Sequence, residues 1–194
     1  STAEGSPKNI IKFECEYDPN LIVKKQKNIS FNNTKKVDSR EICKKFKCKD
    51  VVEVIVDKTI ASDKNKYRLR NSWFNHQGIL IDDFTMTKNI VTINTFVSQA
   101  YYLESYMIDR STGKTKRTFY KFDYYELLED INKIENDTKK RISLYNENGK
   151  ISLKTLTLFN LKPQKKIIFE GKCMEGIGAV SYTHLRAHET LSYR

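Results

Sequence analysis

Few residues of this chain could carry out catalytic chemistry, and their spacing assembles no familiar catalytic set. His76 is the only histidine before residue 180, so a nucleophile–histidine–acid set would have to be built on this one side chain. It stands in the polar run 75–78, where a solvated turn residue is the simpler interpretation. Asp82 and Asp83 are adjacent, so on a strand they would point to opposite faces and could not bind the same ion. We therefore expect no metal site here.

Residues 113–115 read Gly-Lys-Thr and imitate the end of a phosphate-binding loop. The full motif needs a glycine at position 108, which is Ile, and it needs a helix after the lysine, where we expect a returning strand. We therefore predict no nucleotide loop, no cofactor and no enzymatic activity. A hydrolase that uses two carboxylates stays open as an alternative, although no spacing indicates two acids converging in one pocket.

Aromatic residues are concentrated between positions 101 and 125. Alternation places Tyr102 and Tyr106 on one strand face and Tyr101 and Met107 on the other, so both faces are covered or one lines a cavity. Core packing is the simpler interpretation. If a pocket exists, tyrosine hydroxyls around an apolar floor are its expected form. The candidate ligand-binding residues are Tyr102, Tyr106, Tyr120 and Trp73.

The four cysteines, Cys15, Cys43, Cys48 and Cys173, allow three disulfide pairings that sequence alone does not resolve. Cys43 and Cys48 suit a small local loop, whereas Cys15 and Cys173 stand in strand-like segments at the two ends of the domain. In the loop-entropy model, closing the long loop is worth about 5 kcal/mol and closing the short loop about 2 kcal/mol. A zinc site made of all four thiolates is the alternative, but it usually needs two close pairs. We expect two disulfides and an oxidising compartment.

The net charge is +11, and lysine far exceeds arginine. A basic chain suggests a polyanion or an anionic surface as partner. Lysine, asparagine and isoleucine are also what an AT-rich genome places at unconstrained surface positions. Aromatic residues alternate with four basic ones, Lys114, Lys116, Arg117 and Lys121. This arrangement can hold single-stranded nucleic acid, but export from the cell argues against that partner.

Period-two alternation dominates the chain and predicts a mainly β fold. Only residues 124–140 show helical spacing, with Asp123 and Glu126 placed as a capping box. Residues 34–49 show no convincing period, and a weak strand begins near residue 20. The expected strands are 10–17, 51–57, 66–74, 79–87, 89–97, 100–109, 114–122, 151–159 and 165–173. We predict one antiparallel barrel or sandwich of about eight or nine strands with one amphipathic helix.

The turn at 108–114, Ile-Asp-Arg-Ser-Thr-Gly-Lys, and the later Gly171-Lys172-Cys173 resemble a hairpin and a terminal Gly-x-Cys strand of small uncharacterised exported proteins of AT-rich marine bacteria. An early cysteine such as Cys15 is the usual companion of that strand. The resemblance implies an exported protein with a small β-rich fold, and it implies no activity. Asp109 and Arg110 flank the turn, and we expect them to pair weakly at the surface.

The two ends of the chain are set apart from the domain. Residues 1–9 are interpreted as a signal-peptide remnant or a flexible N-terminus, because Ser1-Thr2-Ala3 carries small residues suited to a signal-peptidase cut. Residues 180–190 resemble a translated sequencing adapter read from environmental DNA, so 175–194 are interpreted as a non-native or disordered tail. One domain is expected over residues 10–174.

These observations favour an exported, non-enzymatic β-domain, periplasmic or secreted, that binds a small apolar or amphipathic ligand or a component of the cell envelope. The expected protein is a monomer without a transmembrane segment, since no run reaches the roughly 18 apolar residues of a membrane span. The alternative is a basic module for an anionic polymer such as nucleic acid, polysaccharide or lipid headgroups, and the carboxylate hydrolase is second.

Overall fold

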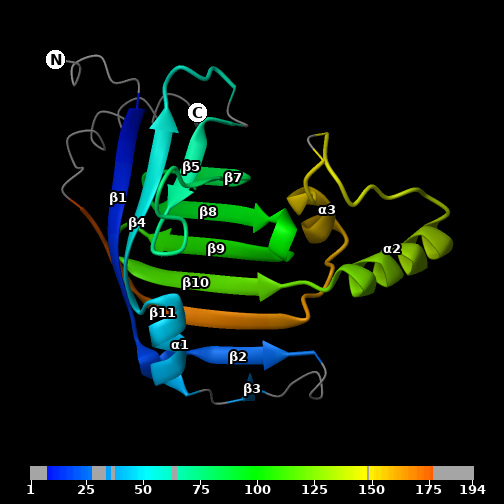
Figure 1. The fold of residues 1–194 in the computed structure, drawn as a ribbon, viewed down its shortest axis with the longest axis horizontal. Coiled ribbons are helices and arrows are strands. Elements are labelled where there is room, and N and C mark those ends of the chain that lie inside the picture. The colour runs from blue at the N-terminus through cyan, green and yellow to red at the C-terminus, as the bar shows by residue number, and fades with distance from the viewer. Residues whose placement is uncertain (1–7, 28–33, 36–37, 63–64, 148, 177–194) are drawn as a thin grey trace.

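The computed structural model describes residues 8–27, 34–35, 38–62, 65–147 and 149–176. They fold mainly into one antiparallel sheet that curls into a half-barrel (Figure 1), which confirms the predicted fold class. The strands are β1 (Lys8–Tyr17), β2 (Val23–Gln26), β3 (Thr34–Lys35), β4 (Lys49–Asp57), β5 (Tyr67–Arg70), β6 (Ile79–Leu80), β7 (Asp83–Met86), β8 (Ile90–Val97), β9 (Tyr102–Asp109), β10 (Lys114–Lys121) and β11 (Lys165–Glu175).

The strand order is β6-β5-β4-β1-β11-β10-β9-β8-β7, with β2 and β3 paired beside β11. The two edge strands, β6 and β7, are consecutive in the chain, so the predicted single strand 79–87 is split. Between them the Ile81 amide donates to the Tyr67 carbonyl at 3.0 Å and the Asp82 amide donates to the Asn94 carbonyl at 2.9 Å. This short segment therefore links the two edges of the curled sheet.

The inner face of the curl holds the main hydrophobic core. Alternate residues of each strand point inward, and in β1 the buried set includes Ile11, Phe13, Cys15 and Tyr17, as the alternation predicts. The missed element is the helix α1 (Ser39–Phe46), whose buried residues Ile42 and Phe46 stand four positions apart. Asp38 precedes this helix and caps it through its side chain. Such a capping residue is a sequence signal for a helix, although so short a segment shows no clear helical period.

Both expected disulfides are present. Cys15 and Cys173 are direct partners in the β1–β11 register and join segments 158 residues apart, while Cys43 and Cys48 close a loop at the end of α1. The first bridge ties the N-terminal strand to the C-terminal strand in the middle of the sheet. The described cysteines therefore leave no thiolate for a zinc site.

A second, smaller core lies on the outer face, at the end of β8, β9 and β10. The predicted amphipathic helix is α2 (Tyr124–Thr138), and Asp123 caps it by accepting from the Glu126 amide. The segment 151–159, predicted as a strand, instead contains the helix α3 (Leu153–Leu158), so that prediction is wrong. Figure 1 shows α2 and α3 beyond the same end of these strands. The core residues are Phe96, Leu103, Phe122, Leu127, Ile131, Leu144, Ile151, Leu156 and Leu161.

The error at α3 has a local cause. Leucine and threonine alternate through this segment, which imitates a strand, but Ser152 precedes it and its hydroxyl accepts from the Thr155 amide at 3.2 Å. That contact is a helix N-cap. Leu153 and Leu156 then fall at helical spacing, and Leu158 is left exposed. The predicted strand 66–74 also ends early, at Arg70, because the Asn71 side chain accepts from the Trp73 and Phe74 amides and turns the chain.

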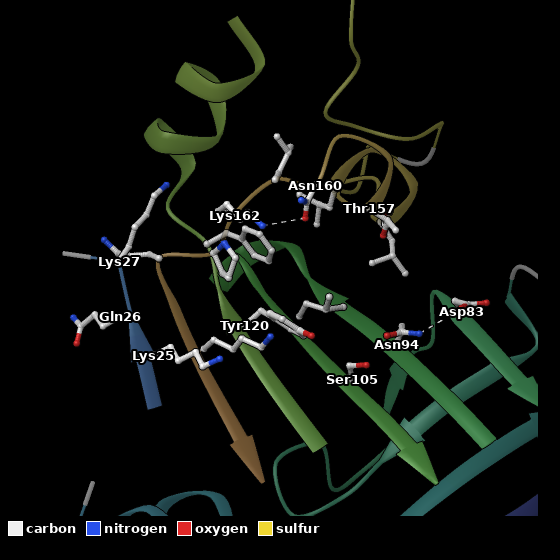
Figure 2. A pocket seen from close by; sticks show the side chains of 18 residues that line it. Lys25, Gln26, Lys27, Asp83, Asn94, Ser105, Tyr120, Thr157, Asn160 and Lys162 are labelled. Atoms are coloured by element: carbon white, nitrogen blue, oxygen red, sulfur yellow. Dashed lines mark hydrogen bonds between the residues drawn. The ribbon is translucent and has the colours of Figure 1, made fainter. Parts of the chain in front are cut away.

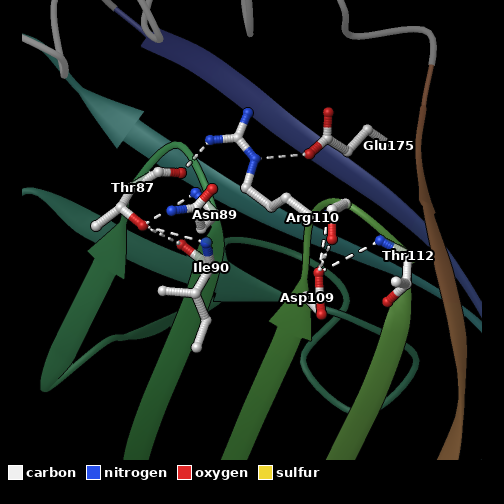
Figure 3. A network of polar contacts seen from close by, with 8 residues as sticks. Thr87, Asn89, Ile90, Asp109, Arg110, Thr112 and Glu175 are labelled. Atoms are coloured by element: carbon white, nitrogen blue, oxygen red, sulfur yellow. Dashed lines mark hydrogen bonds and ion pairs between the residues drawn. The ribbon is translucent and has the colours of Figure 1, made fainter.

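The hairpin between β9 and β10 is held by a polar network that differs from the expected one (Figure 3). Asp109 does not pair with Arg110; its carboxylate accepts from the Ser111 amide at 2.9 Å and from the Thr112 amide at 3.3 Å. Arg110 donates from Nε to Glu175 at 2.9 Å and from Nη1 to the Thr87 carbonyl. The Arg110 side chain is only 3% exposed, so it joins two hairpin turns rather than forming a surface pair.

Candidate ligand-binding site

The structure does not bring the four candidate tyrosine and tryptophan residues together. Tyr102 and Tyr106 are buried on the inner face of the sheet. Trp73 is 40% exposed, and its ring stacks on Phe46 at 5.5 Å between centroids. Only Tyr120 lies on the outer face, where it lines a groove. The inner face therefore uses three of the four aromatic residues for packing.

A buried ion pair stands beside Tyr106 on the inner face. Arg117 donates from Nε to Glu104 Oε1 at 2.7 Å, and the Tyr106 hydroxyl donates to the same oxygen at 2.8 Å. Arg117 also donates to the Phe46 carbonyl at 2.9 Å, and the Asn71 amide donates to the Tyr106 hydroxyl at 3.0 Å. Burial, only partly offset by the positive charge of Arg117, raises the pKa of Tyr106 well above its ordinary value. These groups satisfy one another and fill the curl.

The groove lined by Tyr120 lies on the outer face, between the sheet and α3, and has a volume of about 700 Å³. We call it the outer groove. Its walls combine strands from the middle of the sheet with the segment 153–164, and Figure 2 shows Tyr120 and Ser105 on neighbouring strands below that segment. Its apolar floor is formed by Leu103, Tyr120, Phe122, Leu153, Leu156 and Leu161. A volume of this order fits a small-molecule site with an apolar lining.

Lysines border one side of the outer groove. Lys25 on β2 and Lys166 on β11 are register partners, and Lys162 comes from the loop between α3 and β11. The Lys166 amine lies 5.2 Å from the centre of the Tyr120 ring, a cation–π contact. Burial, together with the charges of Lys25 and other nearby lysines, lowers the pKa of Lys166. Lys27, the fourth lysine, is already paired with Glu126 at 3.4 Å.

A second depression is larger, with a volume of about 1370 Å³, but it is less suited to a ligand. It lies at the opposite end of the outer face, near Leu21 and Met107. Three lysines and four acids line it, and Lys116 and Glu170 are within 4.0 Å of each other, so its charges largely neutralise one another. The outer groove has four lysines and a single aspartate.

The acids that line the third depression offer no obvious catalytic pair. Four acids border it: Glu14, Glu16, Asp50 and Glu53. Glu53 makes two hydrogen bonds to Arg70, at 3.1 and 3.0 Å, and Glu16 lies 3.8 Å from Lys49. Burial raises the pKa of Asp50. Its Oδ1 accepts from the Ser72 amide at 3.2 Å, and its Oδ2 is buried without a hydrogen-bond partner among the described residues. Glu16, Asp50 and Glu53 are thus each engaged in a structural contact.

The remaining sequence candidates are accounted for individually. His76 is exposed. Asp82 accepts from the Phe96 amide at 2.6 Å, and Asp83 accepts from the Asn94 side chain at 3.3 Å. Across the described ranges, no group of three or more His, Cys, Asp or Glu residues is placed to hold a metal ion.

The basic residues of β10 are divided between the two faces. Lys114 and Lys116 border the larger depression of the outer face. Arg117 is buried in the inner core, and Lys121 donates to the Ala100 carbonyl. This strand therefore does not present one continuous basic edge.

No family model matches the chain, and no curated protein or solved structure matches it either. Within the part of the chain that the structure describes, no helix has both the length and the apolar character needed to span a membrane. The predicted tail and signal-peptide remnant lie largely outside the described residues, apart from Lys8 and Asn9 in β1 and residues 175–176.

The residues that make up the outer groove were mostly missed by sequence reasoning. Tyr120 was named as a candidate, but Lys25, Lys162, Lys166 and Leu156 were not. They stand, in that order, on β2, on the loop before β11, on β11 and on α3. The available signal was weak: the alternation of β11 puts Lys166 on the face opposite Ile167, yet nothing in the sequence shows that β2 lies beside it.

Proposed function

We propose that this protein binds a small amphipathic ligand in the outer groove. The observation that carries the proposal is the combination, in one cavity of about 700 Å³, of an apolar floor with a one-sided border of lysines. Polar groups placed at the edge of an apolar cavity fix the orientation of a ligand whose apolar part is buried. The inner face supports the same conclusion, because Arg117, Glu104 and Tyr106 fill it.

A matched pair of variants on one strand tests this proposal. Ser105 and Met107 both lie on the outer face of β9, two residues apart; Ser105 lines the outer groove, and Met107, which is 52% exposed, lines the other depression. Ser105→Trp should fill the outer groove, whereas Met107→Trp should leave it open. Neither change removes a buried side chain.

The measurement is a thermal-shift titration with decanoate, decyl phosphate and decyl maltoside below their micellar concentrations. A ligand at 100 times its Kd adds about 2.7 kcal/mol to the unfolding free energy, which raises the Tm of a chain of this size by roughly 5–11 °C. We expect Ser105→Trp to lose this shift and Met107→Trp to keep it. Equal shifts in both variants would place the ligand elsewhere and contradict the proposal.

We further propose that the protein works in an oxidising compartment, periplasmic or extracellular. The Cys15–Cys173 and Cys43–Cys48 bridges support this, because disulfides persist outside the reducing cytosol. Intact mass after alkylation, with and without prior reduction, tests it on protein taken from its native compartment. No alkylation before reduction is expected, and four alkylated cysteines would refute the assignment.

A further inference from the structure

We infer that the ligand of the outer groove carries one anionic headgroup, a carboxylate or a phosphate, and that Lys25, Lys162 and Lys166 bind it. This inference rests on the proposed function and narrows it from amphipathic ligands in general to anionic ones. It commits to one occupant, a single-headed anionic amphiphile whose apolar chain lies along Tyr120 and Leu156.

The first argument is the placement of the lysines. Lys25 and Lys166 stand directly opposite each other on paired strands, an arrangement in which like charges destabilise a sheet. Lys162 is carried by a different segment and borders the same cavity. Three cations from three parts of the chain therefore gather on one side of an apolar floor, where their mutual repulsion has to be offset.

The second argument is that the chain supplies little to offset it. In the described part of the chain, no ion pair within 4.0 Å involves Lys25, Lys162 or Lys166, whereas the nearby Lys27 contacts both Glu126 and Asp130. Among the contacts of the described residues, the Lys162 amine donates to the neutral side chain of Asn160, at 3.3 Å. The lowered pKa of Lys166, caused by burial and then by Lys25, Lys116 and Lys162, agrees with a crowded positive site. A bound anion would offset the repulsion among these lysines and favour the charged form of Lys166.

The third argument limits the size of the anion. Beyond the outer groove, along the same face of the sheet, the second depression is lined by three lysines and four acids. An extended polyanion would have to continue from Lys166 over this depression, where the nearly balanced charges, among them the Lys116–Glu170 pair, offer it little net attraction. The positive potential is therefore local, and it matches one headgroup rather than a polymer.

Two variants of β11 separate a local headgroup site from general surface charge. Lys166 and Lys172 both lie on the outer face of this strand, but Lys172 borders the second depression. Lys166→Gln and Lys172→Gln change the net charge equally. We expect Lys166→Gln to weaken the binding of decyl phosphate about tenfold, the usual effect of removing one charged hydrogen bond. Lys172→Gln should bind decyl phosphate as the parent does.

Isothermal titration with four probes completes the experiment: decyl phosphate, decanoate, decyl maltoside and inorganic phosphate. Decyl phosphate and decanoate should both bind more tightly than decyl maltoside, and Lys166→Gln should reduce that preference about tenfold. If decyl maltoside binds as tightly as the anionic probes, this inference fails while the proposed function stands.

Three other outcomes are also decisive. If inorganic phosphate binds as tightly as decyl phosphate, the lysine site is supported and the amphiphile is refuted. If no probe binds, both proposals fail. If a heparin fragment displaces decyl phosphate and Lys172→Gln weakens both ligands, the partner is a polymer and the single headgroup is refuted.

Discussion

Replacing Glu104 by glutamine should destabilise the protein far more than the same replacement in a surface ion pair. The Glu104 and Arg117 side chains are each 2% exposed, and one carboxylate oxygen accepts from both Arg117 and the Tyr106 hydroxyl. Glu104→Gln removes the negative charge that Glu104 places beside a buried guanidinium, which keeps its hydrogen bond to the Phe46 carbonyl. Removing one partner of a buried pair costs about 3–5 kcal/mol, and we expect about 3 kcal/mol because the amide oxygen still accepts.

The chain supplies a matched control. Glu53 on β4 pairs with Arg70 on β5, also a Glu–Arg pair across neighbouring strands, with side chains 21% and 31% exposed. Exposed pairs of this kind are worth about 0–1 kcal/mol, so Glu53→Gln should lower the unfolding free energy by less than about 1 kcal/mol. The two variants change net charge equally, and their difference therefore isolates burial.

Urea unfolding followed by circular dichroism at pH 7 measures both losses. A loss of about 3 kcal/mol corresponds to a fall in Tm of roughly 6–12 °C for a domain of this size. The double variant Glu104→Gln/Arg117→Met should lose less than the sum of the single variants, because it leaves no unpaired buried cation. The reasoning is refuted if Glu104→Gln and Glu53→Gln cost the same within about 0.5 kcal/mol, or if the cycle gives no coupling above that value.

Two further predictions concern the disulfides and Asp50. Serine at both Cys15 and Cys173, whose separation is 158 residues, should cost about 5 kcal/mol, against about 2 kcal/mol for serine at Cys43 and Cys48; urea unfolding giving equal losses would contradict the loop-entropy argument. Burial raises the pKa of Asp50 above its ordinary 3.8, so the folded state keeps this proton to a higher pH than the unfolded state does. As the pH rises from 3.8 through the raised pKa, the parent protein should therefore lose stability relative to Asp50→Asn. The difference in unfolding free energy should grow by about 1.4 kcal/mol for each unit by which the pKa is raised, and a difference that stays flat between acid and neutral pH would show that Asp50 is not desolvated.

Local patterns were sufficient for much of the fold. The alternation of Ile11, Phe13, Cys15 and Tyr17 identified the buried face of β1, and the predicted strands around Cys15 and Cys173 led to the correct disulfide. The capping residue Asp123 with helical spacing identified α2. Each of these signals is carried by residues close together in sequence, or by cysteines, whose chemistry limits their partners.

The short helices α1 and α3 were harder to predict, because a segment of six or eight residues contains too few positions to distinguish a helical period from a strand period. α3 contains Leu153, Thr155 and Thr157 in alternation, which also suits a strand, and what decided the outcome was the Ser152 cap. α1 was missed for the same reason. In both helices, the cap was visible in the sequence and carried more information than the hydrophobic pattern.

The site was harder still, because both faces of β9 are apolar. Alternation correctly grouped Tyr102 with Tyr106, but it could not tell which face is enclosed by the curl of the sheet. That depends on α1, whose Phe46 carbonyl accepts from Arg117. Once the inner face is known, Leu103 and Ser105 must face outward, and the outer groove follows from the position of α3.

The inner face of the sheet holds the core and the outer face holds the groove, so stability and ligand binding can be tested separately. On β10, Arg117 points into the curl and holds Glu104 and the Phe46 carbonyl, while Tyr120 points outward beneath Lys166. A single strand thus carries a buried charge that fixes the inner packing and a half-buried ring that lines the groove. Because neighbouring positions face opposite ways, changes at the groove leave the Arg117 network intact, and a loss of ligand binding in Lys166→Gln without a loss of stability is the expected signature of a site built on the outer face.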